Sequence, residues 1–165
     1  MTKICRISMV FALGLAVSPM LLPAQDRDRD KNSIEGTWDV SVIVKDCQTG
    51  ALIRTVRSLQ MFIHDGSVTE TANTAARGSS LGNWRHIEGQ NYEAKYWFFR
   101  YKPDAIFASF AKVVDNITVN SDGTELNSSG TVKDFDADNM LISTGCFTHT
   151  AKRLADSEEV SSDLR

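Results

Sequence analysis

The sequence is poor in the residue patterns that most often carry chemistry. Its 165 residues include only three histidines and three cysteines. It has no Gly-x-Ser-x-Gly elbow, no His-Glu-x-x-His, no Cys-x-x-Cys and no phosphate-binding loop. The histidines His64, His86 and His149 lie far apart and offer no ready metal site. We therefore expect a non-catalytic protein that needs neither a metal nor another cofactor.

Charge of one sign is also scarce. The formal net charge is -3, and acidic and basic residues are mixed along the chain. A nucleic-acid-binding protein would show a basic stripe, and a protein bound to anionic lipid would show a polybasic patch. We expect no nucleic-acid partner, and no membrane partner once the N-terminal segment is removed. The composition leaves the oligomeric state open.

Only the N-terminus has a long apolar run. Lys3 and Arg6 precede the apolar segment 7–22, and Ala24 supplies a small residue at a cleavage point. This arrangement is typical of a secretory signal peptide. The run is shorter than the ~20 apolar residues that a membrane-spanning helix needs. We expect cleavage after residues 1–24 and a secreted or periplasmic protein.

The two ends of the remaining chain lack apolar residues that could build a core. We expect a charged, disordered leader at 25–32 and a polar, disordered tail at 155–165. Between them, 33–154 has the length and composition of a single globular domain.

That domain shows no long amphipathic helix, because its apolar residues recur with a period of two. Turn signals such as Asp65-Gly66 separate the apolar runs. We predict eight strands, at residues 37–46, 54–63, 67–71, 82–88, 91–101, 106–119, 124–134 and 140–153. The segment 72–80 is the longest loop, which we place at the mouth of a barrel.

Consecutive antiparallel strands joined by tight turns predict an all-β fold, an eight-stranded antiparallel up-and-down barrel. A sandwich of two sheets is the alternative. A barrel of eight strands has an interior that holds only side chains or one small ligand.

Gly36-Thr37-Trp38, at the start of the first predicted strand, resembles the G-x-W signature of lipocalins and the wider calycin group. The resemblance implies a calycin-type barrel in which a basic residue of the last strand packs over the Trp. Arg153, or less favourably Lys152, occupies that place. The chain also resembles short exported bacterial proteins of undefined function that carry a Cys in the first strand and another in the last.

Closure of a barrel makes the first and last strands antiparallel neighbours, whose paired residue numbers sum to a constant. Cys47 and Cys146 sum to 193, and Trp38 and Arg153 sum to 191. One register therefore satisfies both pairs within the reach of diagonal neighbours. We expect a disulfide between Cys47 and Cys146, with two free thiols as the alternative.

If Trp38 points inward, the even-numbered residues of the first strand and the odd-numbered residues of the last strand line the lumen. We expect the barrel to bind a small, largely apolar ligand there. The lumen candidates are Val42, Val44, Tyr96, Phe98, Phe147 and His149. We leave open which face of segment 91–101 points inward.

Two other functions stay open. One is a structural or interaction barrel with a filled core, which an empty lumen of less than ~300 Å³ would favour. The other is a haem-binding or isomerase/cyclase-type barrel, with His149 as the haem contact or an inward acid or base as the catalyst. The acid candidates are Glu70, Glu93, Asp115 and Asp134, which we otherwise expect at the surface.

Overall fold

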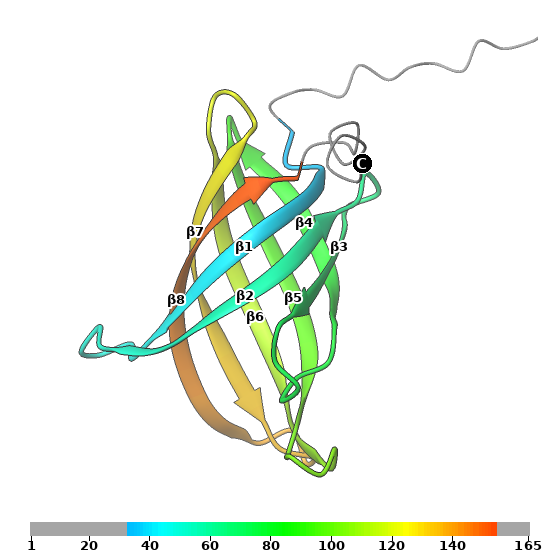
Figure 1. Cartoon of the computed structure of the whole chain (residues 1–165), viewed down its shortest axis with the longest axis vertical. Helices are drawn as coiled ribbons and strands as arrows, with labels where there is room; N and C mark the ends of the chain where they lie inside the picture. Colours follow the sequence, from blue (N-terminus) through cyan, green and yellow to red (C-terminus); the bar gives the residue numbers. More distant parts are fainter. Residues whose placement is uncertain (1–32, 155–165) are drawn as a thin grey trace, which may run out of the picture.

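The computed structural model describes residues 33–154 and shows them as a closed barrel of eight antiparallel strands (Figure 1). The strands follow one another around the barrel in chain order, and β8 pairs with β1. The predicted fold class is thus confirmed, and the closing ladder excludes the two-sheet sandwich. The expected signal peptide, leader and tail lie outside the described residues.

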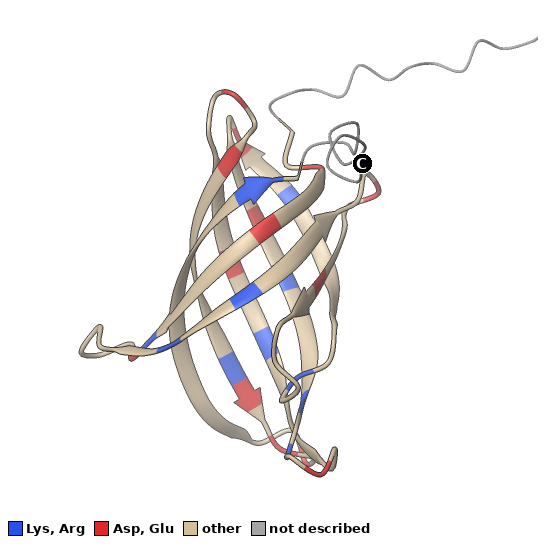
Figure 2. Cartoon of the chain, viewed as in Figure 1, with Lys and Arg blue, Asp and Glu red and all other residues tan. Residues whose placement is uncertain are grey.

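The strands differ from the predicted ranges by at most two residues at either end. They are β1 Gly36–Lys45, β2 Leu52–Phe62, β3 Ser67–Ala72, β4 Ser80–Glu88, β5 Asn91–Tyr101, β6 Phe107–Val119, β7 Glu125–Phe135 and β8 Leu141–Arg153. Along 33–154 there is no helix long and apolar enough to cross a membrane. Figure 2 shows acidic and basic residues mixed over the barrel, without a stripe of one sign in this view.

The closing ladder has the register expected from the sequence. Trp38 pairs with Arg153, and Val42 pairs with His149 four residues further along β1. Trp38, Val40, Phe147, His149 and Ala151 are buried, so the inward parity of both strands is also as expected. The strands β1 and β8 meet because their apolar residues then face a common core.

At the closed end, Arg153 covers Trp38. Its guanidinium lies 4.3 Å from the centre of the indole ring and donates hydrogen bonds to the backbone carbonyls of Ser33, Glu35 and Gly123. The indole Nε1 donates to Ile34 O at 2.8 Å. Lys152 points outward and its side chain is 82% exposed, so Arg153 holds the place that the lipocalin resemblance implies.

Gly36 begins this arrangement. Its φ of 125° lies in a region that residues with a Cβ rarely adopt. The bend lets residues 33–35 fold back across the end of the barrel. Ile34 is fully buried there, and the carbonyl groups of Ser33 and Glu35 reach Arg153. Gly36 therefore contributes to the plug through its backbone conformation.

A disulfide joins Cys47 to Cys146, with Cα atoms 5.0 Å apart and a sequence separation of 99. On the ladder, Cys146 pairs with Lys45, so Cys47 is its diagonal neighbour, two residues beyond. The predicted disulfide is confirmed. It links the last strand to the turn between β1 and β2, at the end opposite Trp38.

The face of β5 that the sequence left open is now defined. Tyr92, Ala94, Tyr96 and Phe98 are buried inside the barrel. Trp97 and Phe99 lie outside and are 48% and 56% exposed.

Candidate functional site

The interior of the barrel changes character from one end to the other. The closed end, around Trp38 and Phe62, is apolar and buried. A set of buried polar side chains follows in the middle, and a hollow opens at the far end. The chemistry that could serve a function lies in the middle and at the open end.

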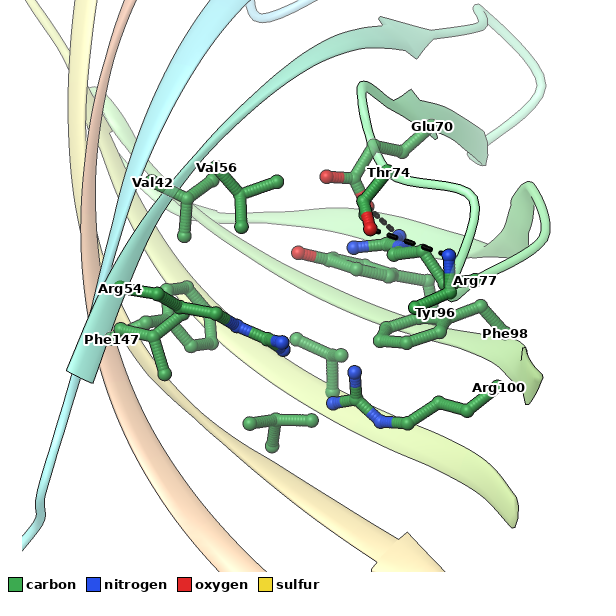
Figure 3. A pocket seen from close by; sticks show the side chains of 14 residues that line it. Val42, Arg54, Val56, Glu70, Thr74, Arg77, Tyr96, Phe98, Arg100 and Phe147 are labelled. Atoms are coloured by element: carbon green, nitrogen blue, oxygen red, sulfur yellow. Dashed lines mark hydrogen bonds and ion pairs between the residues drawn. The ribbon is translucent and has the colours of Figure 1, made fainter. Parts of the chain in front are cut away.

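The hollow at the open end, here called the mouth, has a volume of about 60 Å³. Most of its wall is apolar, and three guanidinium groups enter it (Figure 3). The apolar wall consists of Val42, Val44, Val56, Ala76, Phe98, Val113, Val132 and Phe147. The arginines are Arg54 of β2, Arg77 of the 73–79 loop and Arg100 of β5.

Arg77 and Arg100 are held by carboxylates. Arg77 Nη2 donates to Glu70 Oε2 at 2.6 Å and to Ser80 Oγ at 2.5 Å. Arg100 Nε donates to Asp134 Oδ1 at 2.5 Å. The guanidinium of Arg77 also lies 3.6 Å from the centre of the Phe98 ring, a favourable cation–π distance.

Arg54 is different, because it has no carboxylate partner among residues 33–154. Partial burial of its side chain lowers its pKa and the positive charge of Arg100 lowers it further, whereas the negative charge of Asp134 raises it. The residue as a whole is exposed. A guanidinium nevertheless remains protonated in proteins. With three guanidiniums against the carboxylates of Glu70 and Asp134, the mouth keeps one uncompensated positive charge, at Arg54.

Behind the mouth lies a set of buried polar side chains that we call the polar belt. Each comes from a different strand, and none is more than 9% exposed. The polar belt consists of Gln60, Glu70, Tyr96, Asp115, Ser128 and His149. Its members influence one another electrostatically, since Glu70 acts on the pKa of Tyr96, Asp115 and His149.

Several atoms of the polar belt have no hydrogen-bond partner among the described protein groups. These are both amide atoms of Gln60, both carboxyl oxygens of Asp115, the Ser128 hydroxyl and His149 Nε2. Ser128 is close enough to lower the pKa of Asp115 somewhat, and Gln60 likewise lowers the pKa of Tyr96, but neither side chain makes a hydrogen bond of normal geometry there. A buried polar group without a partner costs about 1–3 kcal/mol.

Asp115 of β6 and His149 of β8 approach each other across β7. Asp115 Oδ2 lies 3.7 Å from His149 Nδ1. Gly130 lies on β7 between these strands, pairing with Asp115 on one side and Phe147 on the other. A Cβ at Gly130 would lie 2.5 Å from the Phe147 ring, so only glycine leaves this space to its neighbours.

Burial moves both groups toward their neutral forms. It raises the pKa of Asp115 from 3.8 to about 7 and lowers the pKa of His149 from 6.5 to about 4. Desolvation penalises a charged side chain of either sign. Near neutral pH the imidazole is therefore uncharged, and the carboxyl group of Asp115 is protonated far more readily than that of an exposed aspartate.

Five of the six predicted lumen residues lie together at the mouth. Val42, Val44, Tyr96, Phe98 and Phe147 all line the mouth. His149 does not line it and is buried in the polar belt, with its ring 6.0 Å from that of Phe147. An engineered apolar cavity that binds benzene measures about 150 Å³, so a hollow of about 60 Å³ gives no support to a haem site.

The expectation that the acid candidates are surface groups is wrong for Glu70 and Asp115, which are 4% and 0% exposed. The alternation of inward and outward residues along β3 and β6 could have predicted that both carboxyl groups are buried. Asp115 shares its face of β6 with Val113 and Ile117, and Glu70 shares its face of β3 with Val68. Glu93, by contrast, lies outside, where it pairs with Arg85 and Lys95.

Sequence reasoning missed the three arginines of the mouth. Arg100 was detectable in principle, because it follows Tyr96 and Phe98 with the same parity. Arg54 likewise shares parity with Gln60 on β2. Arg77 comes from a loop and enters the barrel through its pairing with Glu70. Because it lies outside the strands, their alternation cannot predict that its side chain points inward.

Fold and site together define a closed eight-stranded barrel with one plugged end and one open, cationic end. No family model matches this chain, and no curated protein or solved structure is significantly similar to it.

Proposed function

We propose that this protein binds, at the mouth of its barrel, a small organic anion with a single negative charge and an apolar part. The observation that carries the proposal is Arg54, a cation without a carboxylate partner beside a wall of valine and phenylalanine. Ligand sites commonly combine apolar walls with a few polar anchors.

The size of the mouth limits how such a ligand would lie. About 60 Å³ is well below the ~300 Å³ that would enclose a whole small molecule. Only the end remote from the charge would enter the barrel, and the charged group would stay among the guanidiniums at the rim. An arginine can hold a carboxylate there through two parallel hydrogen bonds.

We place the protein with lipocalin-like barrels, and we propose that it is exported. The plug of Gly36, Trp38 and Arg153 supports the first point. The disulfide supports the second, because such bonds persist in oxidising compartments.

Catalysis is the less favoured use of this interior. Asp115 is an inward acid with a shifted pKa, as an isomerase would require. It does not line the mouth, however, so the charged group and the apolar part of a ligand held there would not touch it. We therefore propose binding without chemistry.

The small volume of the lumen, about 60 Å³ against the ~300 Å³ of an enclosed ligand site, favours a second candidate, a structural or interaction barrel that acts through its outer surface. The functional face would then be the outside of β4 to β6, which exposes Trp97 and Phe99. This candidate predicts no dependence of function on Arg54.

Calorimetric titration with sodium octanoate tests the proposal. We expect binding, and we expect Arg54→Gln to weaken it about tenfold or more, the usual effect of losing a hydrogen bond to a charged group. Arg57→Gln is the matched control, since Arg57 lies on the outer face of the same strand and pairs with Asp39. Failure of octanoate to bind, or equal loss in both variants, would contradict the proposal.

A further inference from the structure

We propose that the polar belt is a second binding subsite, which takes an uncharged hydroxyl or carbonyl group at the far end of the ligand. This inference rests on the proposed function and deepens it. It narrows the ligand class to organic monoanions that carry a neutral hydrogen-bonding group remote from the charge.

The first argument is the unmet hydrogen-bonding capacity of the polar belt. Gln60, Asp115, Ser128 and His149 are nine-tenths buried or more, and each has at least one polar atom without a protein partner. Buried polar groups in folded proteins almost always have a partner. A ligand group that both donates and accepts would supply partners to several of these atoms at once.

The second argument is the charge state of the polar belt. Gln60 and Ser128 are neutral, His149 is uncharged above about pH 4, and Asp115 holds its proton below about pH 7. A hydroxyl or carbonyl group suits such an array. A second carboxylate would instead meet the carboxyl groups of Asp115 and Glu70, so the subsite rejects dianions.

The third argument is position, because the polar belt adjoins the mouth. Glu70 and Tyr96 belong to the polar belt and also line the mouth. Val113 and Phe147, in the wall of the mouth, precede Asp115 and His149 by two residues on the same inward faces. A chain that enters at Arg54 therefore points toward the polar belt.

Arg77 lies between the mouth and the polar belt. It lines the mouth and is bonded to Glu70 behind it (Figure 3). It also donates a hydrogen bond to Ser80. Its loop is tied to β5 by an isolated bridge to Arg100 and by two backbone hydrogen bonds, from Gly78 N to Phe99 O and from Tyr101 N to Ala76 O. The route to the polar belt passes this side chain.

The test compares octanoate with ω-hydroxyoctanoate and with octanedioate by calorimetry, and repeats the series with the ten-carbon acids. At either eight or ten carbons, we expect the ω-hydroxy acid to bind about three- to tenfold more tightly than the parent acid of the same length. This is the gain expected from one hydrogen bond. The dicarboxylate of the same length should bind more weakly than the parent acid.

Variants locate the effect. Gln60→Leu should remove the gain in affinity of the ω-hydroxy acid over its parent acid. Ser128→Ala should reduce the same gain, and it replaces Gln60→Leu if that variant does not fold. Gln48→Leu is the control, because Gln48 lies in the exposed β1–β2 turn and should leave the ratio unchanged. Equal ratios in Gln60→Leu and Gln48→Leu would overturn the subsite.

The outcomes separate the two proposals. If octanoate binds but neither hydroxy acid gains affinity, the subsite is overturned and the mouth site stands. A crystal structure in which the hydroxy acid is bound at the mouth but only water contacts the polar belt would also overturn the subsite and leave the mouth site standing. If none of the acids binds, both proposals are overturned.

Discussion

The carboxyl group of Asp115 and the imidazole of His149 lie 3.7 Å apart at the centre of the barrel, on strands that are not neighbours. Both side chains are at most 1% exposed. Burial favours the neutral form of each, so this is a close pair of polar groups rather than a stable ion pair near neutral pH.

The pair predicts a pH dependence of stability with two opposing parts. Between about pH 4 and 7, folded Asp115 keeps a proton that the unfolded chain has lost, so this group makes the free energy of unfolding fall as pH rises. Between about pH 4 and 6.5, folded His149 lacks a proton that the unfolded chain binds, so its contribution rises with pH. We expect a comparatively flat profile in the wild type.

Single variants should expose the two parts. In Asp115→Asn the free energy of unfolding should rise with pH between about pH 4 and 7 more steeply than in the wild type. In His149→Gln it should fall with pH over the same range. Each difference should amount to at most a few kcal/mol. Urea unfolding at pH steps from 4 to 8 measures both profiles, and parallel profiles in the two variants would contradict the assignment.

Gly130 should tolerate no side chain. Its Cβ would lie 2.2 Å from Val114 O and 2.5 Å from the Phe147 ring, so Gly130→Ala should destabilise the barrel by about 1–3 kcal/mol or more. In Gly78→Ala the nearest neighbour is a Tyr101 ring atom at 3.6 Å, and we expect little change. Thermal unfolding of the two variants makes the comparison, and equal effects would argue against the close approach.

Arg153 should matter far more than the residue beside it. Arg153→Met removes the hydrogen bonds to three backbone carbonyls and the contact with the Trp38 ring, so we expect a loss of about 3 kcal/mol. Lys152→Met removes an exposed side chain 3.9 Å from Glu125, which contributes little. Chemical denaturation of both variants tests the plug, and similar losses would contradict it.

Loss of the disulfide should cost on the order of 4 kcal/mol, because it closes a loop of about 100 residues. The double variant Cys47→Ser with Cys146→Ser, and the reduced wild type, should both melt at a clearly lower temperature than the oxidised protein. Alkylation followed by peptide mass spectrometry should label neither cysteine before reduction. Labelling of both in the native protein would be inconsistent with the bond.

The sequence was sufficient to predict the closure of the barrel because two independent pairs constrain one register. Trp38 with Arg153 fixes the alignment of β1 and β8, and Cys47 with Cys146 agrees with it diagonally. Alternation then determines which side chains point inward, and this placed Val42, Val44 and Phe147 in the wall of the mouth.

Segment 91–101 was ambiguous because aromatic rings occur on both of its faces. The charged residues Glu93 and Lys95 were a usable signal, since they share the outward face with Trp97. The sequence could not have predicted that Arg77 enters the barrel, because this depends on how the 73–79 loop pairs with the end of β5. The uncompensated charge of Arg54 also required the three-dimensional pairing of the other two arginines.

The disulfide has one consequence for how the molecule responds to proteases. Cys47 and Cys146 enclose β2 to β7 and every turn between those strands. A single cut in any of these turns leaves the two fragments joined through the cystine and still held by the ladders around them. The nicked protein would migrate as one chain on a denaturing gel and separate into two pieces only after reduction.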